Sequence, residues 1–311
     1  MARNLPSYLN LVQNGELAQR IKAAGKRLQD CRLCPRKCGV DRLSGETGVC
    51  NTGAHAWVSS YSPHFGEEAP LVGSSGSGTI FFTHCSLMCN FCQNYDISHE
   101  GLGQKVTAAQ LAALMMALQE SGCHNINFVT PSHVVPQILE ALGVAVNEGL
   151  RVPLVYNTGG YDRVETLKLI EGVFDIYMPD FKFWDPEVAE KTCSAADYPA
   201  VARSALVEMH RQVGDLQMDP SGIATKGLLI RHLVMPGGLA GTRDVMRFIA
   251  RDLSTDSYVN IMTQYRPCGR AAEVPELADF PSRADFKEAL AAAREQGLHR
   301  LDRPRRVFRL R

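Results

Sequence analysis

The sequence predicts an α/β fold: a partial (β/α)6 barrel with a parallel sheet, plus a small N-terminal cysteine-rich metal-binding module. From Thr79 onward, short apolar runs of strand length alternate with helical patterns, which is typical of a parallel sheet with crossover helices. The part before it combines a polar helical segment, four cysteines and a Gly/Ser-rich stretch at residues 72–78. We therefore expect a helix and a four-cysteine module in residues 1–78, and the barrel with a C-terminal extension in residues 79–311.

Composition narrows the class of protein. Basic and acidic residues both number 33, so the net charge is zero and no long-range field favours nucleic acid or an anionic membrane. The longest apolar run, Leu111 to Leu118, is too short to span a bilayer, and the first residues hold no apolar stretch of signal-peptide length. Seven of the ten cysteines fall in two tight groups, which indicates metal binding in a reducing compartment. We expect a cytoplasmic protein with no nucleic-acid or membrane partner.

Six apolar runs are the candidate strands of the barrel. They are Thr79–Phe82, Ile126–Thr130, Pro153–Tyr156, Phe174–Met178, Gly227–Val234 and Tyr258–Thr263. In barrels built this way the chemistry sits at the C-terminal ends of the strands. The loop that follows the first strand is therefore expected at the functional edge.

Helical patterns lie between these runs and before them. A polar helix is expected from about Tyr8 to Leu28. Thr107 and Gln110 have the form of a capping box, ahead of a buried stripe at Leu111, Leu114, Met115 and Leu118 and an end at Gly122. Asp162 with Glu165 makes a similar helix start.

Three cysteines within eight residues are the most informative motif. Cys85, Cys89 and Cys92 form a CxxxCxxC pattern with Phe91 just before the last thiol. Three thiolates can hold three irons of a 4Fe–4S cube and leave the fourth iron open, whereas electron-transfer clusters mostly take four cysteines. The alternative is a zinc knuckle completed by His84 or by a distant cysteine.

The CxxxCxxC loop after a first strand resembles that of the radical S-adenosylmethionine (SAM) enzymes. The later strand ends resemble the pyruvate formate-lyase activating enzyme branch, and most of all its relatives with an extra N-terminal four-cysteine module. The resemblance implies that the amine and carboxylate of SAM chelate the open iron, that one electron from a flavodoxin- or ferredoxin-type donor cleaves SAM, and that the 5′-deoxyadenosyl radical takes a hydrogen atom from substrate.

The same resemblance implies roles for polar residues at the strand ends. Thr130 and Ser132 stand where the family binds the methionine amine, although its usual glutamate is missing here; they also have the form of a helix cap. Lys182 is the candidate partner of the cofactor carboxylate. The remaining expected contacts are Asn157, Thr158 and Asp180 with the Met178 carbonyl for a monovalent cation, and His232 and Gln264 near the ribose and adenine. A local Asp180–Lys182 ion pair and a buried core histidine are the alternatives.

A second cysteine group precedes the barrel. Cys31, Cys34, Cys38 and Cys50 supply four thiolates, enough for a tetrahedral zinc site or for a fully ligated auxiliary iron–sulfur cluster. The spacing does not separate the two. Cys123, Cys193 and Cys268 are expected as buried small hydrophobes, with Cys268 the exception because its loop should overlook the site. The basic run at residues 301–311 is expected as a solvated closing strand or tail, or as a docking patch for an acidic partner.

The expected function is therefore hydrogen-atom abstraction by a radical SAM enzyme. A glycyl-radical activase acting on a glycine of a partner protein is the first candidate. A radical maturase or a peptide- or small-molecule-modifying enzyme is the alternative, and a non-enzymatic iron–sulfur electron-transfer or scaffold protein is the alternative of another class. The sequence assigns no acid–base catalytic residue, and the substrate is not legible because substrate contacts vary freely on one fold.

Overall fold

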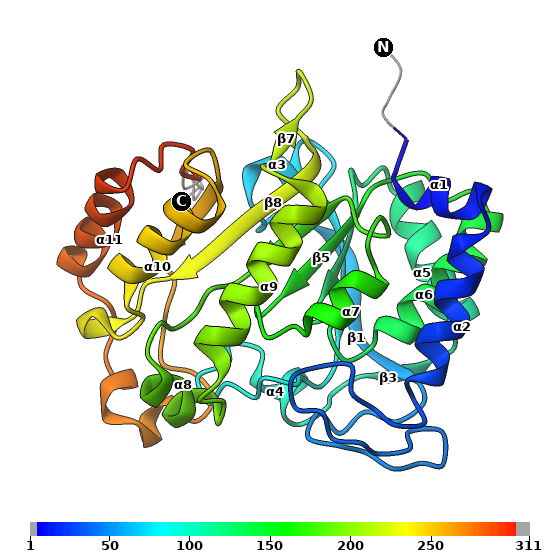
Figure 1. Ribbon diagram of the computed structural model, residues 1–311, viewed down its shortest axis with the longest axis horizontal. Coiled ribbons are helices and arrows are strands. Elements are labelled where there is room, and N and C mark those ends of the chain that lie inside the picture. Colours follow the sequence, from blue (N-terminus) through cyan, green and yellow to red (C-terminus); the bar gives the residue numbers. More distant parts are fainter. Residues whose placement is uncertain (1–4, 303–311) are drawn as a thin grey trace, which may run out of the picture.

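The structure is a computed structural model that describes residues 5–302, and nine strands make up the sheet of this described part. Figure 1 labels several of these strands. The strands run over Ala56–His64 (β1), Ser77–Phe82 (β2), Gln104–Val106 (β3), Ile126–Val129 (β4), Leu154–Thr158 (β5), Ile176–Pro179 (β6), Gln217–Met218 (β7), Ala224–Leu233 (β8) and Tyr258–Met262 (β9). Their spatial order is β3-β1-β2-β4-β5-β6-β8-β7, and β9, which lies off this path, also pairs with β8.

The parallel part of the sheet is continuous from β2 to β9. Each of β2, β4, β5, β6, β8 and β9 pairs in parallel with the next, beginning with Gly78 opposite Ile126 and ending with Leu233 opposite Met262. The exceptions are β1 and β3, which add on antiparallel beyond β2, and β7, which pairs antiparallel with β8. The fold is thus α/β with a largely parallel sheet, consistent with the partial barrel expected from the sequence.

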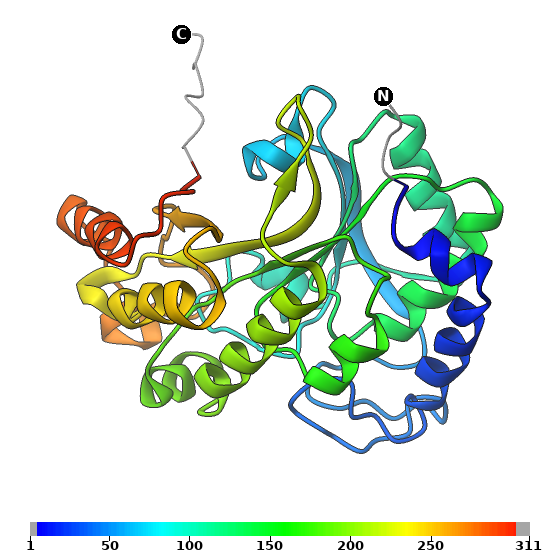
Figure 2. The same cartoon turned by 45° about the horizontal axis from the view of Figure 1, so that its top comes forward.

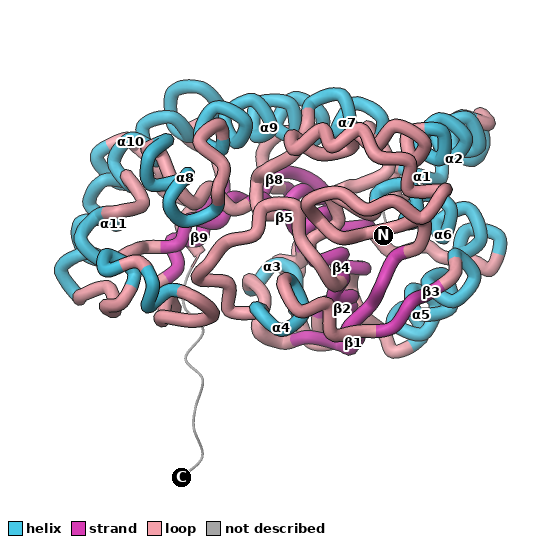
Figure 3. The backbone as a smooth tube through the Cα atoms, turned by 90° about the horizontal axis from the view of Figure 1, so that it is seen from below, coloured by secondary structure: helices cyan, strands magenta, loops and turns pink. Residues whose placement is uncertain are grey.

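Helices cover the outer face of this sheet. They run over Tyr8–Gln13 (α1), Glu16–Lys26 (α2), Ala69–Val72 (α3), Tyr95–Ser98 (α4), Ala108–Glu120 (α5), Val135–Asn147 (α6), Val164–Leu169 (α7), Pro186–Cys193 (α8), Tyr198–Val213 (α9), Thr242–Phe248 (α10) and Arg283–Glu295 (α11), with shorter helical turns at Pro236–Gly238, Ile249–Leu253, Ala271–Glu273 and Pro275–Leu277. Seen from below in Figure 3, most of them form an arc around the strands, whereas α3 and α4 lie on the other side. None of the described helices is long and apolar enough to cross a bilayer.

The six predicted strands are all present, with bounds shifted by at most a few residues. They read as short apolar runs because both of their faces are buried, as in β5, where all five residues are buried. The predicted capping box is also present: Gln110 N–H donates to Thr107 Oγ1 at 3.2 Å, and Thr107 N–H donates to Gln110 Oε1 at 2.9 Å. Three residues of the predicted stripe, Leu111, Met115 and Leu118, are buried, and the fourth, Leu114, is partly buried against the same core.

Two helix predictions were wrong. The helix expected over Tyr8–Leu28 is two helices, because Gly15 adopts a left-handed φ of 78° between α1 and α2. Asp162 does not cap α7, which begins after Arg163 without a side-chain cap. Its carboxylate is instead buried and bound by hydroxyl groups of neighbouring strand ends. A short-range pattern does not reveal such a tertiary use of an acidic side chain.

The predicted boundary at residue 78 falls inside β2, and β1, which precedes it, belongs to the same sheet. The division into two parts therefore stays a prediction. The predicted basic run lies almost wholly outside the described residues; its first residue, Leu301, bridges in parallel to Val259 of β9. The loops of residues 27–55, blue in Figures 1 and 2, lie at the lower edge of the molecule in both views.

Candidate functional site

One cavity of about 200 Å³ opens at the C-terminal ends of the parallel strands. The structure brings most of the residues predicted from sequence to its wall. Those residues are Cys85, Cys89, Phe91, Cys92, Thr130, Asn157, Thr158, Asp180, Lys182 and Gln264. Ser132 and His232 are not among the lining residues. Side chains far apart in the chain thus converge on the cysteine loop, as expected where parallel strands end together.

The cysteine loop directly follows β2 and is tightly folded. His84 and Met88 both adopt left-handed backbone conformations, with φ of 66° and 59°. The Leu87 N–H donates to Cys85 Sγ at 3.4 Å, and the Cys92 N–H donates to the Cys89 carbonyl at 3.2 Å. Left-handed non-glycine residues cost free energy and concentrate at functional sites, so the loop is held in a conformation that its local sequence does not favour.

The three cysteines of the loop lie beside one another, with Cys89 buried and Cys85 and Cys92 partly buried. Burial and then the neighbouring Cys89 raise the pKa of Cys85 to about 12, and the same two causes raise the pKa of Cys92. The hydrogen bond with Cys193, followed by burial, raises the pKa of Cys89. Thiolates at this place therefore need a positive partner. A bound metal centre provides one, because metal binding releases the thiol protons.

The donor set fits a cluster with an open iron. Within residues 5–302, no group of three or more His, Cys, Asp or Glu side chains is arranged to hold a single metal ion. The described residues that line the cavity include three cysteines and no histidine. His84, the expected fourth ligand of a zinc knuckle, instead meets the Trp57 ring edge-on at 6.4 Å. A distant cysteine, Cys193, does lie next to the loop, with its Sγ 3.4 Å from Cys89 Sγ, but it is not among the residues that line the cavity. The three thiols that do line the cavity suit a 4Fe–4S cube that keeps one iron for another ligand.

A chain of charged side chains lies against the cavity wall. Asp180 pairs with Lys182 and, at 3.2 Å, with the Arg231 guanidinium, which also contacts Glu67 at 3.3 Å. Burial opposes ionisation of Asp180, but Lys182 and then Arg231 outweigh it and lower its pKa. Burial likewise opposes the charge on Lys182, but Asp180 and then Cys89 raise its pKa. Lys182 therefore carries its positive charge into the cavity, and the predicted alternative of an Asp180–Lys182 pair is also present.

Two cations already compensate the Asp180 carboxylate, so its charge does not require a monovalent metal ion. The cation site stays a prediction. Arg231 was missed by sequence reasoning, although a signal existed: it is a charged residue inside the buried strand β8, after Leu228, Leu229 and Ile230. A charge within a buried run indicates a specific partner.

Ser132 lies behind the cavity in a hydroxyl network. Its Oγ donates to Asp162 Oδ1 at 2.6 Å, Tyr156 OH donates to the same oxygen at 2.9 Å, and Thr158 Oγ1 donates to Asp162 Oδ2 at 2.5 Å. Burial raises the pKa of Asp162, and the three hydroxyl donors oppose that rise. Asp162 thus orients Thr158, which does line the cavity.

His232 lies in the core next to the site. Its Nδ1 donates to the Phe181 carbonyl at 2.7 Å, and its Nε2 accepts from the Thr242 hydroxyl at 2.9 Å, because a carbonyl can only accept. Burial lowers its pKa to about 4, so the ring is neutral. Both ring nitrogens are used within the protein, which matches the core-histidine alternative.

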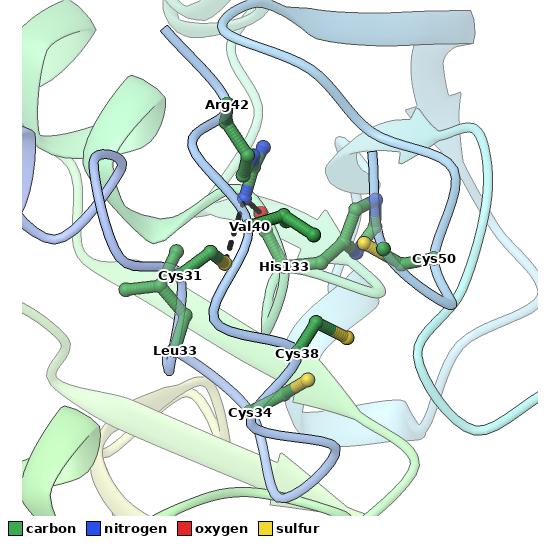
Figure 4. Close-up of a pocket in the computed structure, with 9 residues that line it drawn as sticks. Cys31, Leu33, Cys34, Cys38, Val40, Arg42, Cys50 and His133 are labelled. Carbon is green, nitrogen blue, oxygen red and sulfur yellow. Dashed lines mark hydrogen bonds between the residues drawn. The ribbon is translucent and has the colours of Figure 1, made fainter. Parts of the chain in front are cut away.

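The four N-terminal cysteines line a second, much smaller cavity of about 10 Å³ (Figure 4). Cys34 is held beside the other three, and burial raises its pKa to about 12. A side chain at Gly48 would place its Cβ 2.5 Å from Cys38 Sγ, so only glycine fits there. The Val49 N–H donates to Cys38 Sγ at 3.4 Å. The sulfur atoms share one space but do not point at a common centre.

Two nitrogen-bearing side chains also line this second cavity, Arg42 from the N-terminal loops and His133 from the segment before α6. Arg42 is 1% exposed and donates to Cys31 Sγ at 3.8 Å and to the His133 carbonyl at 2.8 Å. His133 Nε2 donates to the Thr83 carbonyl at 2.9 Å, which leaves Nδ1 as a lone pair without a partner within the described part of the chain. Sequence reasoning gave His133 no role, because only the fold brings it to these cysteines.

Comparison with known proteins agrees with this geometry. Residues 79–212 match the sequence model of the Radical SAM superfamily, so a radical SAM domain is present in this part of the chain. Members of that superfamily are enzymes that use a 4Fe–4S cluster and SAM. The chain is also similar to the uncharacterized protein MJ0674 of Methanocaldococcus jannaschii, with 29% identity over 299 residues that cover 93% of this chain and 82% of that protein. The similarity thus extends over both cysteine groups.

We expect Asp162→Ala to lower the free energy of unfolding by about 3 kcal/mol or more, because it leaves three buried hydroxyls without their charged acceptor. Denaturant unfolding of the purified protein measures it. The exposed Asp279 is the matched control, and Asp279→Ala should stay within about 0.5 kcal/mol of the parent. Equal stability of the two variants would contradict an organising role for Asp162.

Proposed function

We propose that this protein is a radical SAM enzyme whose 4Fe–4S cluster is held by Cys85, Cys89 and Cys92. The observation that carries the proposal is that these cysteines share one cavity with polar residues from the ends of β4, β5 and β6, within a radical SAM domain. The bound cluster would supply one electron that cleaves SAM to a 5′-deoxyadenosyl radical, which abstracts a hydrogen atom. The chain's own residues bind, orient and shield the reactants.

The residues of the cavity wall have different proposed roles. Lys182 offers an ammonium for the carboxylate of SAM, held in place by Asp180. Thr130, with a left-handed φ of 61°, and Asn157 supply polar groups nearby, linked by the Thr130 N–H donating to the Asn157 carbonyl at 2.8 Å. The apolar side chains of Phe81, Leu233 and Met262 exclude water from a reactive radical.

The activity of a glycyl-radical activase is our first candidate within this chemistry. Its support is the resemblance of the strand-end segments to the activating-enzyme branch, and it requires a flavodoxin- or ferredoxin-type electron donor and a protein substrate. A maturase, or an enzyme acting on a peptide or small molecule, uses the same cavity. Adding a candidate glycyl-radical protein to the reduced enzyme and SAM tests the first candidate by the appearance of a protein-based glycyl radical signal.

The anaerobically reconstituted protein should convert SAM to 5′-deoxyadenosine when reduced with dithionite, and Cys89→Ala should abolish the product because it removes one leg of the tripod. Liquid chromatography measures the product. Cys123→Ala, which removes a buried cysteine outside the cavity, is the matched control and should retain activity. A scaffold protein would instead yield no product, and SAM would leave the paramagnetic resonance spectrum of its reduced cluster unchanged.

Lys182→Met should raise the SAM concentration for half-maximal cleavage about tenfold, equivalent to about 1.4 kcal/mol, because a charge-assisted contact with the SAM carboxylate is lost. Initial rates at varied SAM measure it. Lys191→Met is the control, since Lys191 is half-exposed on α8 and pairs with Glu276 at the surface. An unchanged half-saturation value in Lys182→Met would remove Lys182 from the SAM site.

We propose further that the four N-terminal cysteines hold a structural zinc. The cavity of about 10 Å³ is the size of one water-sized sphere, which suits one ion better than a cube of irons and sulfides. Four thiols and the bare His133 Nδ1 are zinc donors, and the Arg42 guanidinium beside Cys31 offsets thiolate charge. Binding would require small rotations of the cysteine side chains toward one centre.

The full-length protein should therefore carry about one zinc per chain besides the iron of the tripod cluster. Cys38→Ala should release the zinc while the tripod still takes up about four irons on reconstitution. Elemental analysis measures both metals, with Cys123→Ala as the control. Iron in place of zinc at this site would instead establish an auxiliary cluster.

A further inference from the structure

Arg36 joins the two cysteine groups of the protein. It lies between Cys34 and Cys38, and its guanidinium reaches the loop that carries the tripod. Nε donates to the Ser86 carbonyl at 2.9 Å and Nη2 to the Leu87 carbonyl at 3.1 Å. Ser86 and Leu87 are the residues that follow Cys85, so the contacts fall inside the CxxxCxxC motif itself.

The same guanidinium holds the end of α8. Nη2 donates to the Cys193 carbonyl at 2.9 Å and Nη1 donates to the Ser194 carbonyl. These carbonyls belong to the last turn and cap of a helix, where they have no partner within the helix and favour a cation. One side chain thus satisfies four backbone acceptors from two segments.

Only arginine can make this set of contacts. Its planar fork presents five donors in a fixed geometry, whereas a lysine ammonium is a single point on a flexible stem. The ring of Tyr161 supports the fork, with the guanidinium carbon 5.3 Å from the ring centroid. Backbone hydrogen bonds hold the segment behind it, such as the Lys37 N–H to the Cys34 carbonyl at 3.1 Å.

Cys193 extends this connection to the tripod sulfur. Its Sγ donates to Cys89 Sγ at 3.4 Å, and it is 1% exposed. It is not among the residues that line the cavity, so it contacts Cys89 from the surrounding protein. Hydrogen bonds to ligating sulfurs shift the reduction potential of an iron–sulfur cluster.

We infer that Arg36 is a positioning residue for the radical cluster, fixing Cys85 through the Ser86 and Leu87 carbonyls and Cys89 through Cys193. This inference rests on the proposed function. The four-cysteine segment then contributes to the radical site, because it positions the Arg36 guanidinium that binds the tripod loop.

The test compares Arg36→Met, Arg36→Lys and a matched control, Arg32→Met, in the full-length reconstituted protein. Arg32 lies in the same segment, is exposed, and its side chain pairs with Asp30 at 3.0 Å. Arg36→Met should lower the rate of SAM cleavage per cluster about 10- to 100-fold, because small misplacement of reacting groups is costly. Arg36→Lys should fall between Arg36→Met and the parent, and Arg32→Met should match the parent.

Two spectroscopic readouts separate positioning from mere stability. In Arg36→Met the change that SAM causes in the spectrum of the reduced cluster should weaken, at equal iron content and equal folded fraction. Cys193→Ala should make the reduction potential more negative, because a donor to the Cys89 thiolate is lost, and Cys193→Ser should restore it by keeping a donor.

The inference is overturned if Arg36→Met matches Arg32→Met per cluster in cleavage rate, SAM spectrum and potential. It is also overturned if the loss in Arg36→Met follows only the loss of folded, iron-loaded protein. Failure of the proposed function is distinct, since it appears in the parent protein as an absence of 5′-deoxyadenosine. In that case the cluster potential of the Arg36 and Cys193 variants still decides whether Arg36 acts on the tripod.

Discussion

The site depends on one constraint: three cysteines, one buried and two partly buried, lie beside one another in a loop at the carboxyl edge of a parallel sheet. Burial and the neighbouring Cys89 raise the pKa values of Cys85 and Cys92, and the hydrogen bond with Cys193, followed by burial, raises the pKa of Cys89. Deprotonating the three thiols is unfavourable without a positive partner, and it becomes favourable when a cationic metal centre binds the thiolates. The loop also contains two strained left-handed residues, His84 and Met88, so contacts with the surrounding fold must stabilise its conformation.

The surrounding fold supplies that support in layers. Beneath the loop, the ends of β5 and β6 bring Thr158, Asp180 and Lys182 to the cavity, and Asp162 and Arg231 fix two of these from behind. The charges alternate in sign along Lys182, Asp180, Arg231 and Glu67, so each buried charge has an opposite neighbour. Such chains tolerate burial because every member is paired. Lys182, at the end of the chain, pairs with Asp180 and lines the cavity.

Sequence periodicity predicted the six parallel strands because buried strands are short apolar runs between helices, and that signal is local. The motif of three cysteines was equally local. The antiparallel strands β1 and β3 were not predicted, since Ala56–His64 is mostly exposed beyond Val58 and lacks an apolar pattern. The break at Gly15 was missed although the Asn14-Gly15 pair is a turn signal, because the helical pattern on both sides of it was read as one helix.

The supporting residues of the site were less predictable for a different reason. Asp162 has the sequence context of a helix cap, yet three hydroxyls from two strand ends bind it. Contacts between residues about 50 to 160 positions apart in the chain define the roles of Arg36, Arg42 and His133. Composition and spacing identify groups that bind a metal together within one loop. They do not identify side chains that hold such a loop from another element, because that relation exists only after folding.

The placement of the four-cysteine segment against the tripod loop also explains why a small segment with a thin core is ordered. Its own apolar cluster of buried residues is only Leu28, Cys31 and Leu33. Arg36 and Arg42 tie it to the barrel through carbonyls of Ser86, Leu87, Cys193 and His133. Those carbonyls belong to the tripod loop, the C-terminal end of α8 and the segment between β4 and α6. The segment and the site therefore stabilise each other, and any bound metal that rigidifies one lowers the conformational entropy that the other must lose.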